Sequence, residues 1–361
     1  MREMKDSGLQ WAGDIPQYWN IAKGKHFMAV LERPVRDDDN VITCFRDGEV
    51  TLRSNRREDG FTVATVEVGY QGIEPGDLVV HGMDGFAGAI GISDSRGKGT
   101  PALNVLSCSE NKKYIMYLLR AMAYTEVFMA LSTGIRVRTC DTNWKKLKSL
   151  DYLIPPADEQ QCIADFLDAK CAEIDALTAD IQTQIDTLEQ YKRSVITETV
   201  TKGLNPNAEM KDSGIQWIGN MPAHWDVVRG KYILHYMQKP VREDDGVITC
   251  FRDGEVTLRS NRREEGFTMS DKEIGYQGID VGDLVVHGMD GFAGSIGISD
   301  SRGKASPVLN VLDTDQCKRY IMYYLRSMAY SDVFLALATG IRVRSCDLRW
   351  NKLAELSYPV P

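Results

Sequence analysis

The sequence contains no long apolar run and no recognisable export signal. None of its hydrophobic segments approaches the roughly 20 residues that a helix needs to cross a bilayer. The opening stretch MREMKDSGLQWAGDIPQYW also lacks an apolar core followed by a small-residue cleavage site. These absences exclude a membrane-spanning helix, and they lead us to expect a cytoplasmic protein.

The common signatures of catalysis are absent together. There is no GxxxxGK(S/T) loop for ATP, no HExxH zinc helix and no GxSxG nucleophile turn. The Asn-Pro-Pro-aromatic tetrapeptide of adenine methyltransferases is missing as well. A single absence carries little weight, but the combination favours a binding protein over an enzyme.

A disulfide framework is not expected either. The eight cysteines form no Cys-x-x-Cys pair, and the chain is large and without an export signal, so free thiols are expected. Cys44 and Cys140 recur as Cys250 and Cys346, which is typical of small buried side chains carried along by a duplication.

The main feature that the sequence does contain is a long internal repeat. Met4 to Pro155 aligns with Met210 to Pro361 at a constant offset of 206 residues and without a gap. A unit of about 150 residues is large enough to be a domain, whereas solenoid repeats are several-fold shorter. We therefore predict two copies of one globular domain, at residues 1–155 and 209–361.

Each copy has a mixed helix and strand pattern. Residues 77–81 and 89–93 are predicted to be short strands on either side of the glycine-rich turn GMDGFAG. Apolar residues on one face predict a helix from Tyr114 to Leu131 that stops before Gly134. The predicted fold class is α+β.

Residues 156–208, between the copies, have a different pattern. Two prolines precede a predicted helix start, and from Leu167 to Val195 apolar residues recur every seven positions, with further apolar side chains between them. This predicts one long coiled-coil-type spacer helix, which at some 40 residues would extend roughly 60 Å. Because such a stripe is not stable in water alone, it needs a partner helix.

Charge is distributed unevenly along the chain. The formal net charge is −8, and residues 157–195 hold nine acidic against three basic residues. The two repeated domains are therefore close to neutral, and the acidic total does not argue against nucleic-acid binding by them.

The stretch VITCFRDGEVTLRSNRRE begins at Val41 and recurs unchanged at Val247. Arginine and asparagine are the side chains best shaped to pair with guanine and adenine edges. Neighbouring segments have diverged between the copies, which favours a shared DNA-reading task for this stretch, although recent gene conversion would leave the same pattern. The candidate DNA-binding residues are Arg46, Arg53, Asn55, Arg56 and Arg57, with their counterparts Arg252, Arg259, Asn261, Arg262 and Arg263.

An alternative interpretation of this stretch is a solvated loop. In that case its own carboxylates would neutralise the arginines. The acidic residues are Asp47, Glu49, Glu58 and Asp59.

A second basic segment, TGIRVRTCDTNWKKLK, follows the predicted helix. Its basic residues outnumber its single acidic residue, Asp141, and the second copy keeps most of them. We predict that the segment contacts DNA, with phosphates as the expected target. Its candidate residues are Arg136, Arg138 and Lys145, with Arg342, Arg344 and Arg349 in the second copy.

The segment GDLVVHGMDGFAGAIGIS is nearly identical in the two copies. His81 and Asp84, which recur as His287 and Asp290, are candidates for a metal site or an acid/base pair. A metal site normally needs three or four ligands, and no third His or Cys is nearby. A structural hairpin whose glycines let the backbone approach DNA is the favoured interpretation, so no catalytic residue and no metal are predicted.

Three motifs together resemble the specificity subunits of type I restriction-modification enzymes. DSGIQWIGNMPAHW is similar to the start of a target recognition domain, and GDLVVHGMDGFAGAIGI is similar to the glycine hairpin of that domain. STGIRVRTCDTNWKKLKSLDYLIPPADEQQ, with the helix that follows, resembles the end of the domain, a Pro-Pro-x-x-Glu-Gln signature and the start of a spacer helix. The resemblance covers essentially the whole chain.

The resemblance implies a DNA-binding subunit that is not itself an enzyme. Each target recognition domain would read one half of a bipartite site in double-stranded DNA, and antiparallel spacer helices would set the gap. The implied partners are methylation subunits, which use S-adenosylmethionine to methylate adenine, and a restriction subunit, which uses ATP and Mg²⁺ and cleaves DNA. This chain would itself hold no cofactor.

The chain departs from the family pattern in two ways. Family members commonly carry unlike recognition domains, whereas these two are nearly identical, so we expect an inverted repeat of half-sites around an unread gap. The given sequence also stops at Pro361, the counterpart of Pro155, before a second spacer helix. Either it stops early, or a second copy supplies the helix in a homodimer. The alternative function is a stand-alone bivalent DNA-binding or decoy protein without methylation partners.

Overall fold

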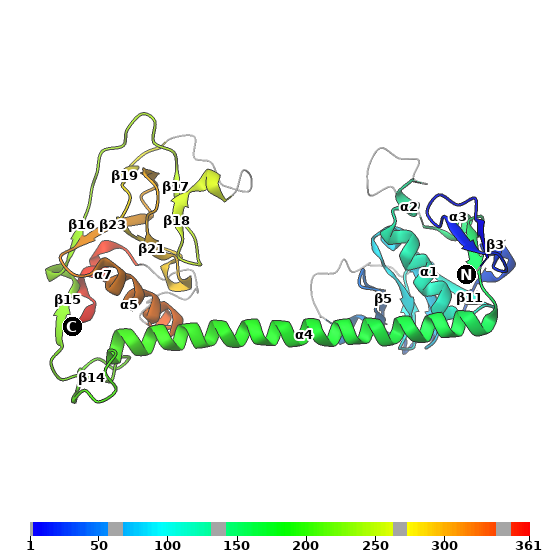
Figure 1. The fold of residues 1–361 in the computed structure, drawn as a ribbon, viewed down its shortest axis with the longest axis horizontal. Coiled ribbons are helices and arrows are strands. Elements are labelled where there is room, and N and C mark those ends of the chain that lie inside the picture. The colour runs from blue at the N-terminus through cyan, green and yellow to red at the C-terminus, as the bar shows by residue number, and fades with distance from the viewer. Residues whose placement is uncertain (1–2, 57–67, 131–141, 263–272, 337–347) are drawn as a thin grey trace. The chain divides into compact units, whose positions relative to one another are not determined.

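The computed structural model describes residues 3–56, 68–130, 142–262, 273–336 and 348–361. The chain divides into two compact units, Met1–Ala179 (unit 1) and Asp180–Pro361 (unit 2). Each unit combines strands with helices, and one long helix joins them (Figure 1). The predicted class, two similar α+β domains joined by a helix, is confirmed.

In the part of unit 1 that the structure describes, short strands pair in five antiparallel sheets. Strands β8 and β9 fall within the ranges predicted from the sequence, which confirms those two strands. The strands are β1 (Met4–Asp6), β2 (Asp14–Pro16), β3 (Asn20–Lys23), β4 (Met28–Val30), β5 (Ile42–Cys44), β6 (Val50–Leu52), β7 (Gln71–Ile73), β8 (Leu78–His81), β9 (Ile90–Ile92), β10 (Gly97–Gly99), β11 (Leu103–Cys108) and β12 (Asp151–Ile154).

The central sheet of unit 1 has the strand order β4-β11-β8-β9, and the other sheets are the pairs β1-β2, β3-β12, β5-β6 and β7-β10. Val79 lies opposite Val105 on one side and Gly91 on the other. Side chains alternate between the two faces of a strand. Leu78 and Val80 therefore belong to one apolar cluster, whereas Val79 belongs to another. The sheet separates two cores within the unit.

Helix α1 (Lys112–Tyr124) covers one face of this sheet. The Asn111 side chain caps the helix, because its Oδ1 accepts a hydrogen bond from the Tyr114 N–H at 3.0 Å. The face predicted to be apolar is the buried one. It comprises Ile115, Leu118, Leu119 and Met122.

The helix predicted to run to Leu131 ends earlier, so that prediction is wrong. After α1 the backbone of Glu126 takes a left-handed φ of 60°, which interrupts the helix, and a separate turn, α2 (Val127–Ala130), begins. The change of direction buries Phe128 in the core beneath α1. The stretch from Leu131 to Gly134 lies outside the described residues.

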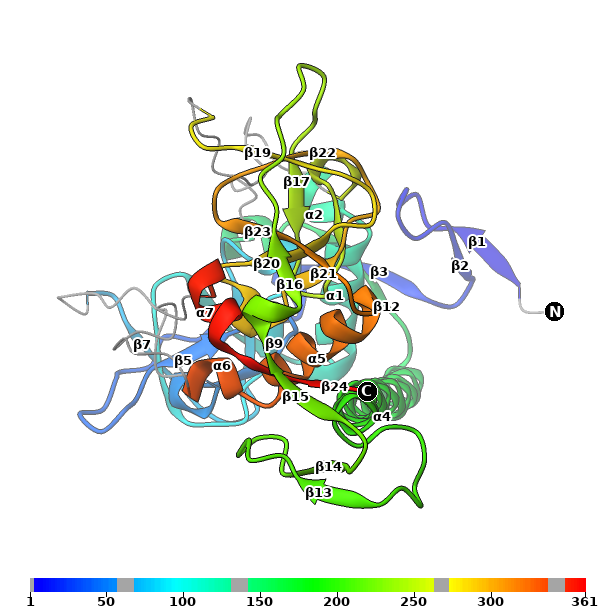
Figure 2. The same cartoon turned by 90° about the vertical axis from the view of Figure 1, so that its left-hand side faces the viewer.

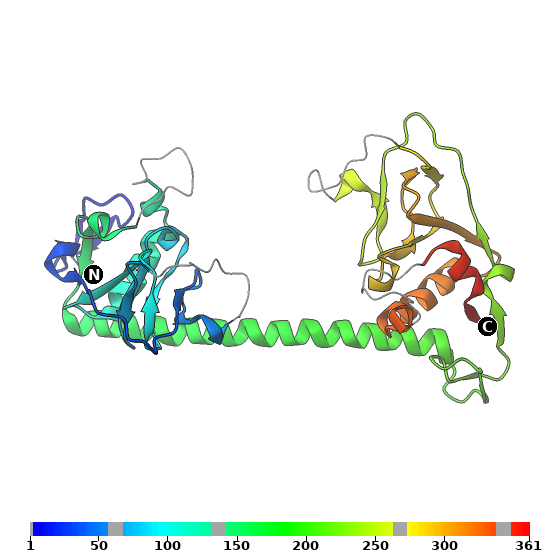
Figure 3. The same ribbon diagram turned by 180° about the vertical axis from the view of Figure 1, so that it is seen from behind.

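Helix α4 (Ala157–Lys202) is the predicted spacer (Figure 3). It begins directly after the Pro-Pro pair, where proline needs no amide hydrogen. It ends before Gly203, whose φ of 75° is the left-handed conformation that stops helices. Ala164, near its start, is buried in unit 1, and Val200, near its end, is buried in unit 2.

Between these ends the apolar stripe of α4 is exposed. The described parts of the chain leave each of its side chains between 42% and 67% accessible. Within the described ranges, no helix combines the length and the apolar character needed to span a membrane. The exposed stripe therefore has the pattern of a coiled-coil seam, and no described helix of this chain packs against it. The stripe consists of Ile174, Leu177, Ile181, Ile185, Leu188, Tyr191 and Val195.

Unit 2 repeats the architecture of unit 1. Its central sheet has the order β16-β23-β20-β21, and Figure 2 shows α5 and α7 beside it. The strands are β13 (Met210–Asp212), β14 (Asn220–Pro222), β15 (Asp226–Arg229), β16 (Leu234–Tyr236), β17 (Ile248–Cys250), β18 (Val256–Leu258), β19 (Gln277–Ile279), β20 (Leu284–His287), β21 (Ile296–Ile298), β22 (Gly303–Ala305), β23 (Leu309–Thr314) and β24 (Ser357–Val360). The helices are α5 (Lys318–Tyr330), α6 (Val333–Ala336) and α7 (Trp350–Glu355), and the counterpart of α7 in unit 1 is α3 (Trp144–Leu147).

The cysteines in the described residues are free thiols, as predicted. Cys44 and Cys250 are buried, which confirms their expected role as small core side chains. Burial raises the pKa of Cys44 to about 12, so this thiol is not ionised at neutral pH. Cys140 and Cys346 lie outside the described residues.

Candidate nucleic-acid interface

The arginine-rich stretch forms a hairpin and a following turn, which we call the arginine turn (residues 45–56 in unit 1 and 251–262 in unit 2). In the hairpin β5-β6, Ile42 and Val50 face the core, and Thr43 lies opposite Thr51. The chain then enters a short 3₁₀ helix, Arg53–Asn55. The alternation of the hairpin thus fixes the base of the arginine turn in the apolar core.

Arg56 is bound within its own turn. Its Nη1 lies 2.5 Å from Asp47 Oδ2 and 3.1 Å from Glu49 Oε2. Its guanidinium covers the Phe45 ring at 4.4 Å from the centroid. Arg262 makes the equivalent contacts in unit 2, with ion-pair distances of 2.7 and 3.0 Å. For these two arginines the alternative interpretation, neutralisation by nearby carboxylates, describes the geometry correctly.

The pairing lowers the pKa values of the aspartates in the arginine turn. Burial alone would raise the pKa of Asp47, but the Glu49 amide and the Arg56 guanidinium outweigh it and hold the pKa below its ordinary value. The pKa of Asp253 is lowered in the same way. Glu58 and Asp59, the other two acids of the stretch, lie outside the described residues.

Acid should therefore weaken the arginine turn. The folded-state pKa of Asp47 lies below the ordinary value of 3.8, so the pairing stabilises the fold above that pH. This stabilisation is lost as the pH falls from 3.8 through the folded-state pKa of Asp47, because the carboxylate becomes protonated. We expect Asp47→Asn with Asp253→Asn to lower the free energy of unfolding at neutral pH and to differ less from wild type near pH 3, in urea titrations of the full chain. A difference of the same size at both pH values would contradict the assignment.

Arg46 extends outward from the arginine turn. Its Nη2 lies 2.9 Å from Asp84 Oδ1, and 67% of the side chain is exposed. Arg252 pairs with Asp290 at 3.1 Å in the same way. An exposed ion pair of this kind contributes only about 0–1 kcal/mol, so little is lost when the arginine turns to another anion. Of the candidates in the described part of the turn, Arg46 and Arg252 are therefore the most accessible to an outside anion. Contact with DNA by them stays a prediction.

Two other candidates form hydrogen bonds inside the hairpin. Arg53 Nε donates to Thr43 Oγ1 at 3.3 Å, and Asn55 Nδ2 donates to Thr51 Oγ1 at 2.8 Å. Unit 2 repeats both bonds, from Arg259 and Asn261. These side chains hold the shape of the turn, and base reading by them stays a prediction.

The glycine-rich segment forms a second turn, which we call the glycine turn (residues 82–88 and 288–294). His81 Nδ1 accepts hydrogen bonds from the Met83 and Asp84 backbone N–H groups, at 3.2 and 3.0 Å. Burial lowers the pKa of His81, which favours the neutral imidazole that accepting requires. His287 makes the same two bonds. The histidine therefore organises the turn, and its Nδ1 is not available to act as a base.

The glycines of this segment let the two turns pack together. A Cβ on Gly91 would lie 1.9 Å from the carbonyl oxygen of Gly48, and a Cβ on Gly88, whose φ is 93°, would lie 2.6 Å from that of Arg46. Only glycine allows both approaches. In the structure these glycines admit the arginine turn. An approach of DNA to the same backbone stays a prediction. The two turns form one composite surface in each unit.

Arg120 and Tyr124 belong to this surface, although neither was predicted. Arg120 Nη2 donates to Tyr124 Oη at 2.7 Å, and its guanidinium lies against Gly48 of the arginine turn. Arg326 and Tyr330 repeat the pair in unit 2. The i, i+4 spacing is visible in both copies of the sequence, but only the fold shows that the end of this helix meets the arginine turn.

The second basic segment is described only in part. Lys145 is exposed on α3, and Arg349 is exposed at the start of α7. The backbone before α3 is anchored, since Thr142 Oγ1 donates to the His81 carbonyl at 2.7 Å and the Trp144 N–H donates to Asn104 Oδ1 at 3.0 Å. The remaining candidates lie outside the described residues. They are Arg57, Arg136, Arg138, Arg263, Arg342 and Arg344.

The described residues contain no group of three or more His, Cys, Asp or Glu side chains placed to hold a metal ion.

No protein-family model matches this chain. Over 246 residues the chain is 25% identical to the MjaX specificity subunit assigned to a type I restriction enzyme of Methanocaldococcus jannaschii, a match that covers 60% of this chain and 52% of that protein. The chain is a relative of type I restriction enzyme specificity subunits. The resemblance seen in the motifs is thereby confirmed.

Further comparisons agree with this relationship. The MjaVIII specificity subunit of the same organism is 30% identical over 129 residues, which cover 35% of this chain and 28% of that protein. The matches thus span about half, or less, of these specificity subunits. A chain from a solved structure of a type I restriction-modification system has a TM-score of 0.57 at 11% identity, over 96% of this chain and 86% of that one. That likeness shows that the fold is shared.

Proposed function

We propose that this chain is the DNA-recognition subunit of a type I restriction-modification system, with units 1 and 2 each reading one half of a bipartite site in double-stranded DNA. The observation that carries the proposal is the composite surface of arginine and glycine turns, in which Arg46, Arg56 and His81 make the same contacts as their counterparts in unit 2. Among the described arginines of that surface, Arg46 and Arg252 are the most exposed. Arginine is well suited to pair with guanine edges and with phosphates.

The proposed partners are those that the family resemblance implies. Methylation subunits would supply S-adenosylmethionine and the adenine-methylating site, into which the target base would be flipped. A restriction subunit would supply ATP-driven and Mg²⁺-dependent cleavage. The exposed stripe of α4 supports pairing with a second helix, and we propose that a second copy of the chain provides it.

DNA selection tests the reading of a bipartite site. Because the described arginine turns have the same residues and the same ion pairs, each unit should prefer the same bases. Antiparallel helices would place the two half-sites in opposite orientation. We expect the full chain, alone or with its methylation subunit, to enrich an inverted repeat with an unread gap from random duplexes. Enrichment of two unrelated half-sites would count against equal reading by the two units, and no enrichment would count against the function.

A second possibility is a stand-alone bivalent DNA-binding or decoy protein. Co-purification of the full chain with a co-expressed methylation subunit separates the two functions. A stable complex supports the specificity subunit, and sequence-selective binding by a chain that forms no such complex supports the stand-alone protein.

A further inference from the structure

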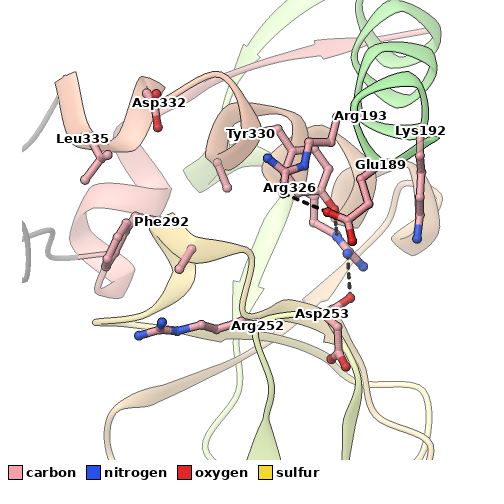
Figure 4. Close-up of a pocket in the computed structure, with 12 residues that line it drawn as sticks. Glu189, Lys192, Arg193, Arg252, Asp253, Phe292, Arg326, Tyr330, Asp332 and Leu335 are labelled. Carbon is pink, nitrogen blue, oxygen red and sulfur yellow. Dashed lines mark hydrogen bonds and ion pairs between the residues drawn. The ribbon is translucent and has the colours of Figure 1, made fainter. Parts of the chain in front are cut away.

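A pocket of about 460 Å³ in unit 2 lies between the composite surface and α4 (Figure 4). One wall consists of Arg252 and Asp253 from the arginine turn, together with the glycine turn. The end of α5 forms the second wall, with Arg326 and Tyr330, and α4 contributes Lys192 on the third. The pocket thus combines cationic side chains from three separate elements.

Most of the charges around this pocket are already paired. Asp253 is bound by Arg262 at 2.7 Å, and Arg262 also pairs with Glu255 at 3.0 Å. Glu189 lies 3.9 Å from Arg193, one turn further along α4, and Arg252 is paired with Asp290. Because these charges are paired with one another, they contribute little to the attraction of a charged ligand.

Two cations in the pocket have no such partner among the described residues. Arg326 donates from Nε to Tyr330 Oη at 2.8 Å and from Nη2 to the Asp253 carbonyl at 2.6 Å, and both acceptors are neutral. Lys192 makes no ion pair with a described side chain, and it is exposed on α4. Against these two cations stands one further carboxylate, Asp332, at the turn between α5 and α6. Among the described residues that line the pocket, four cations face three carboxylates, so an anion that enters meets a small surplus of positive charge.

The guanidinium of Arg326 is held in place before any ligand arrives. A Cβ on Gly254, whose φ is 89°, would lie 2.1 Å from Arg326 Nη1, so the guanidinium rests directly on the glycine backbone. The Arg193 guanidinium covers the Tyr330 ring at 5.2 Å from its centroid. A fixed guanidinium with spare N–H donors beside a mobile ammonium is well suited to bind phosphate oxygens.

Comparison with unit 1 shows how α4 changes the surroundings of the Arg326–Tyr330 pair. Arg120 bonds to Tyr124 as Arg326 bonds to Tyr330, yet Tyr124 is 64% exposed, whereas Tyr330 is half-buried beneath Arg193. The difference comes from the residues of α4, which have no counterpart in the repeat. The pocket of unit 2 is therefore a feature of the spacer helix as well as of the recognition unit.

We propose that this pocket binds a phosphate group, and that the phosphate belongs to the backbone of the DNA that unit 2 reads. The inference rests on the proposed function for its choice of DNA, because Arg252 of the arginine turn lines the same pocket. Arg326 and Lys192 are the phosphate ligands. They position the duplex and carry no base preference.

Binding of a short random-sequence duplex by the full chain, measured at several salt concentrations, tests the inference. We expect Lys192→Gln and Arg326→Gln each to weaken binding about tenfold at low salt. Each should also reduce the slope of log affinity against log salt by about 0.9, the value for one phosphate contact. Arg326→Lys keeps the charge and should keep the slope. Lys170→Gln, an exposed lysine of α4 outside the pocket, should change neither quantity.

A second measurement separates this inference from the proposed function. Inorganic phosphate should raise the unfolding temperature of the wild type more than that of Lys192→Gln. Protection by phosphate without any duplex binding would overturn the proposed function and support a site for a free phosphate compound. Duplex binding with unchanged salt slopes in both Gln variants would overturn the phosphate site alone. If Lys192→Gln lost only a co-purified methylation subunit, the pocket would be a protein contact, and the inference would be wrong.

Discussion

Placing aspartate at both Ile181 and Leu188 should convert the chain from a dimer paired through α4 into a monomer. Both side chains lie in the exposed stripe, at 55% and 65% accessibility, and are seven residues apart. Burying an isoleucine or leucine stabilises an interface by about 1.5–3 kcal/mol, and a symmetric dimer would bury each residue twice. Aspartate removes that gain and places charge in the seam. The dimer should weaken by about a thousandfold or more, as measured by light scattering over a range of concentrations.

A matched pair of substitutions controls for the added charge. Thr183→Asp with Gln190→Asp has the same spacing and the same charge change, and each position lies about 200° around the helix from its stripe neighbour. That variant should remain dimeric. A wild-type chain that is monomeric throughout would refute pairing in trans, and a dimer that survives in the stripe variant would place the contact elsewhere.

Gly91→Ala with Gly297→Ala should separate the arginine turn from strands β9 and β21, which follow the glycine turn in the two units. The added Cβ would lie 1.9 Å from the Gly48 carbonyl oxygen in unit 1 and 2.0 Å from that of Gly254 in unit 2. Backbone atoms cannot rotate away as a side chain can, so overpacking should cost about 2–3 kcal/mol in each unit. Arg46 and Arg252 would be displaced at the same time. We expect a lower free energy of unfolding in urea and a loss of selectivity among DNA sequences.

The comparison variant is Gly76→Ala with Gly282→Ala. These glycines have φ of 84° and 88°, but nothing lies within 4 Å of the position that a Cβ would take. Only backbone strain, about 1 kcal/mol in each unit, should result, and DNA selection should persist. If both double variants selected DNA as the wild type does, the packing of the two turns would have no role in recognition.

The elements that the sequence predicted well are those set by local pattern. The long helix begins after the Pro-Pro pair and ends before Gly203, because proline and a left-handed glycine act through their own backbone. The strands around the glycine turn were predicted by alternation. The repeat itself predicted two domains of one fold, because near-copies of a sequence must fold alike.

The features that the sequence did not predict depend on contacts between distant segments. The break at Glu126 is not signalled by glycine or proline, and it follows from the burial of Phe128 against a core formed elsewhere. The contact between Arg120 and the arginine turn joins residues some seventy positions apart. Likewise, the inward hydrogen bond of Asn55 depends on a hairpin register that no spacing of arginines could reveal.

The first turns of α4 pack in the core of unit 1, and its last turns pack in the core of unit 2. A protease cut or a gene truncation within either end of the helix would therefore remove part of a core. Ala164 is fully buried in unit 1, and the Gln160 side chain accepts the Asn111 N–H at 3.0 Å. At the other end, the Val200 carbonyl accepts a hydrogen bond from Tyr320 Oη at 3.0 Å. A cut near the middle of the helix should therefore leave two folded half-molecules. Each would keep the part of α4 that packs against its own core.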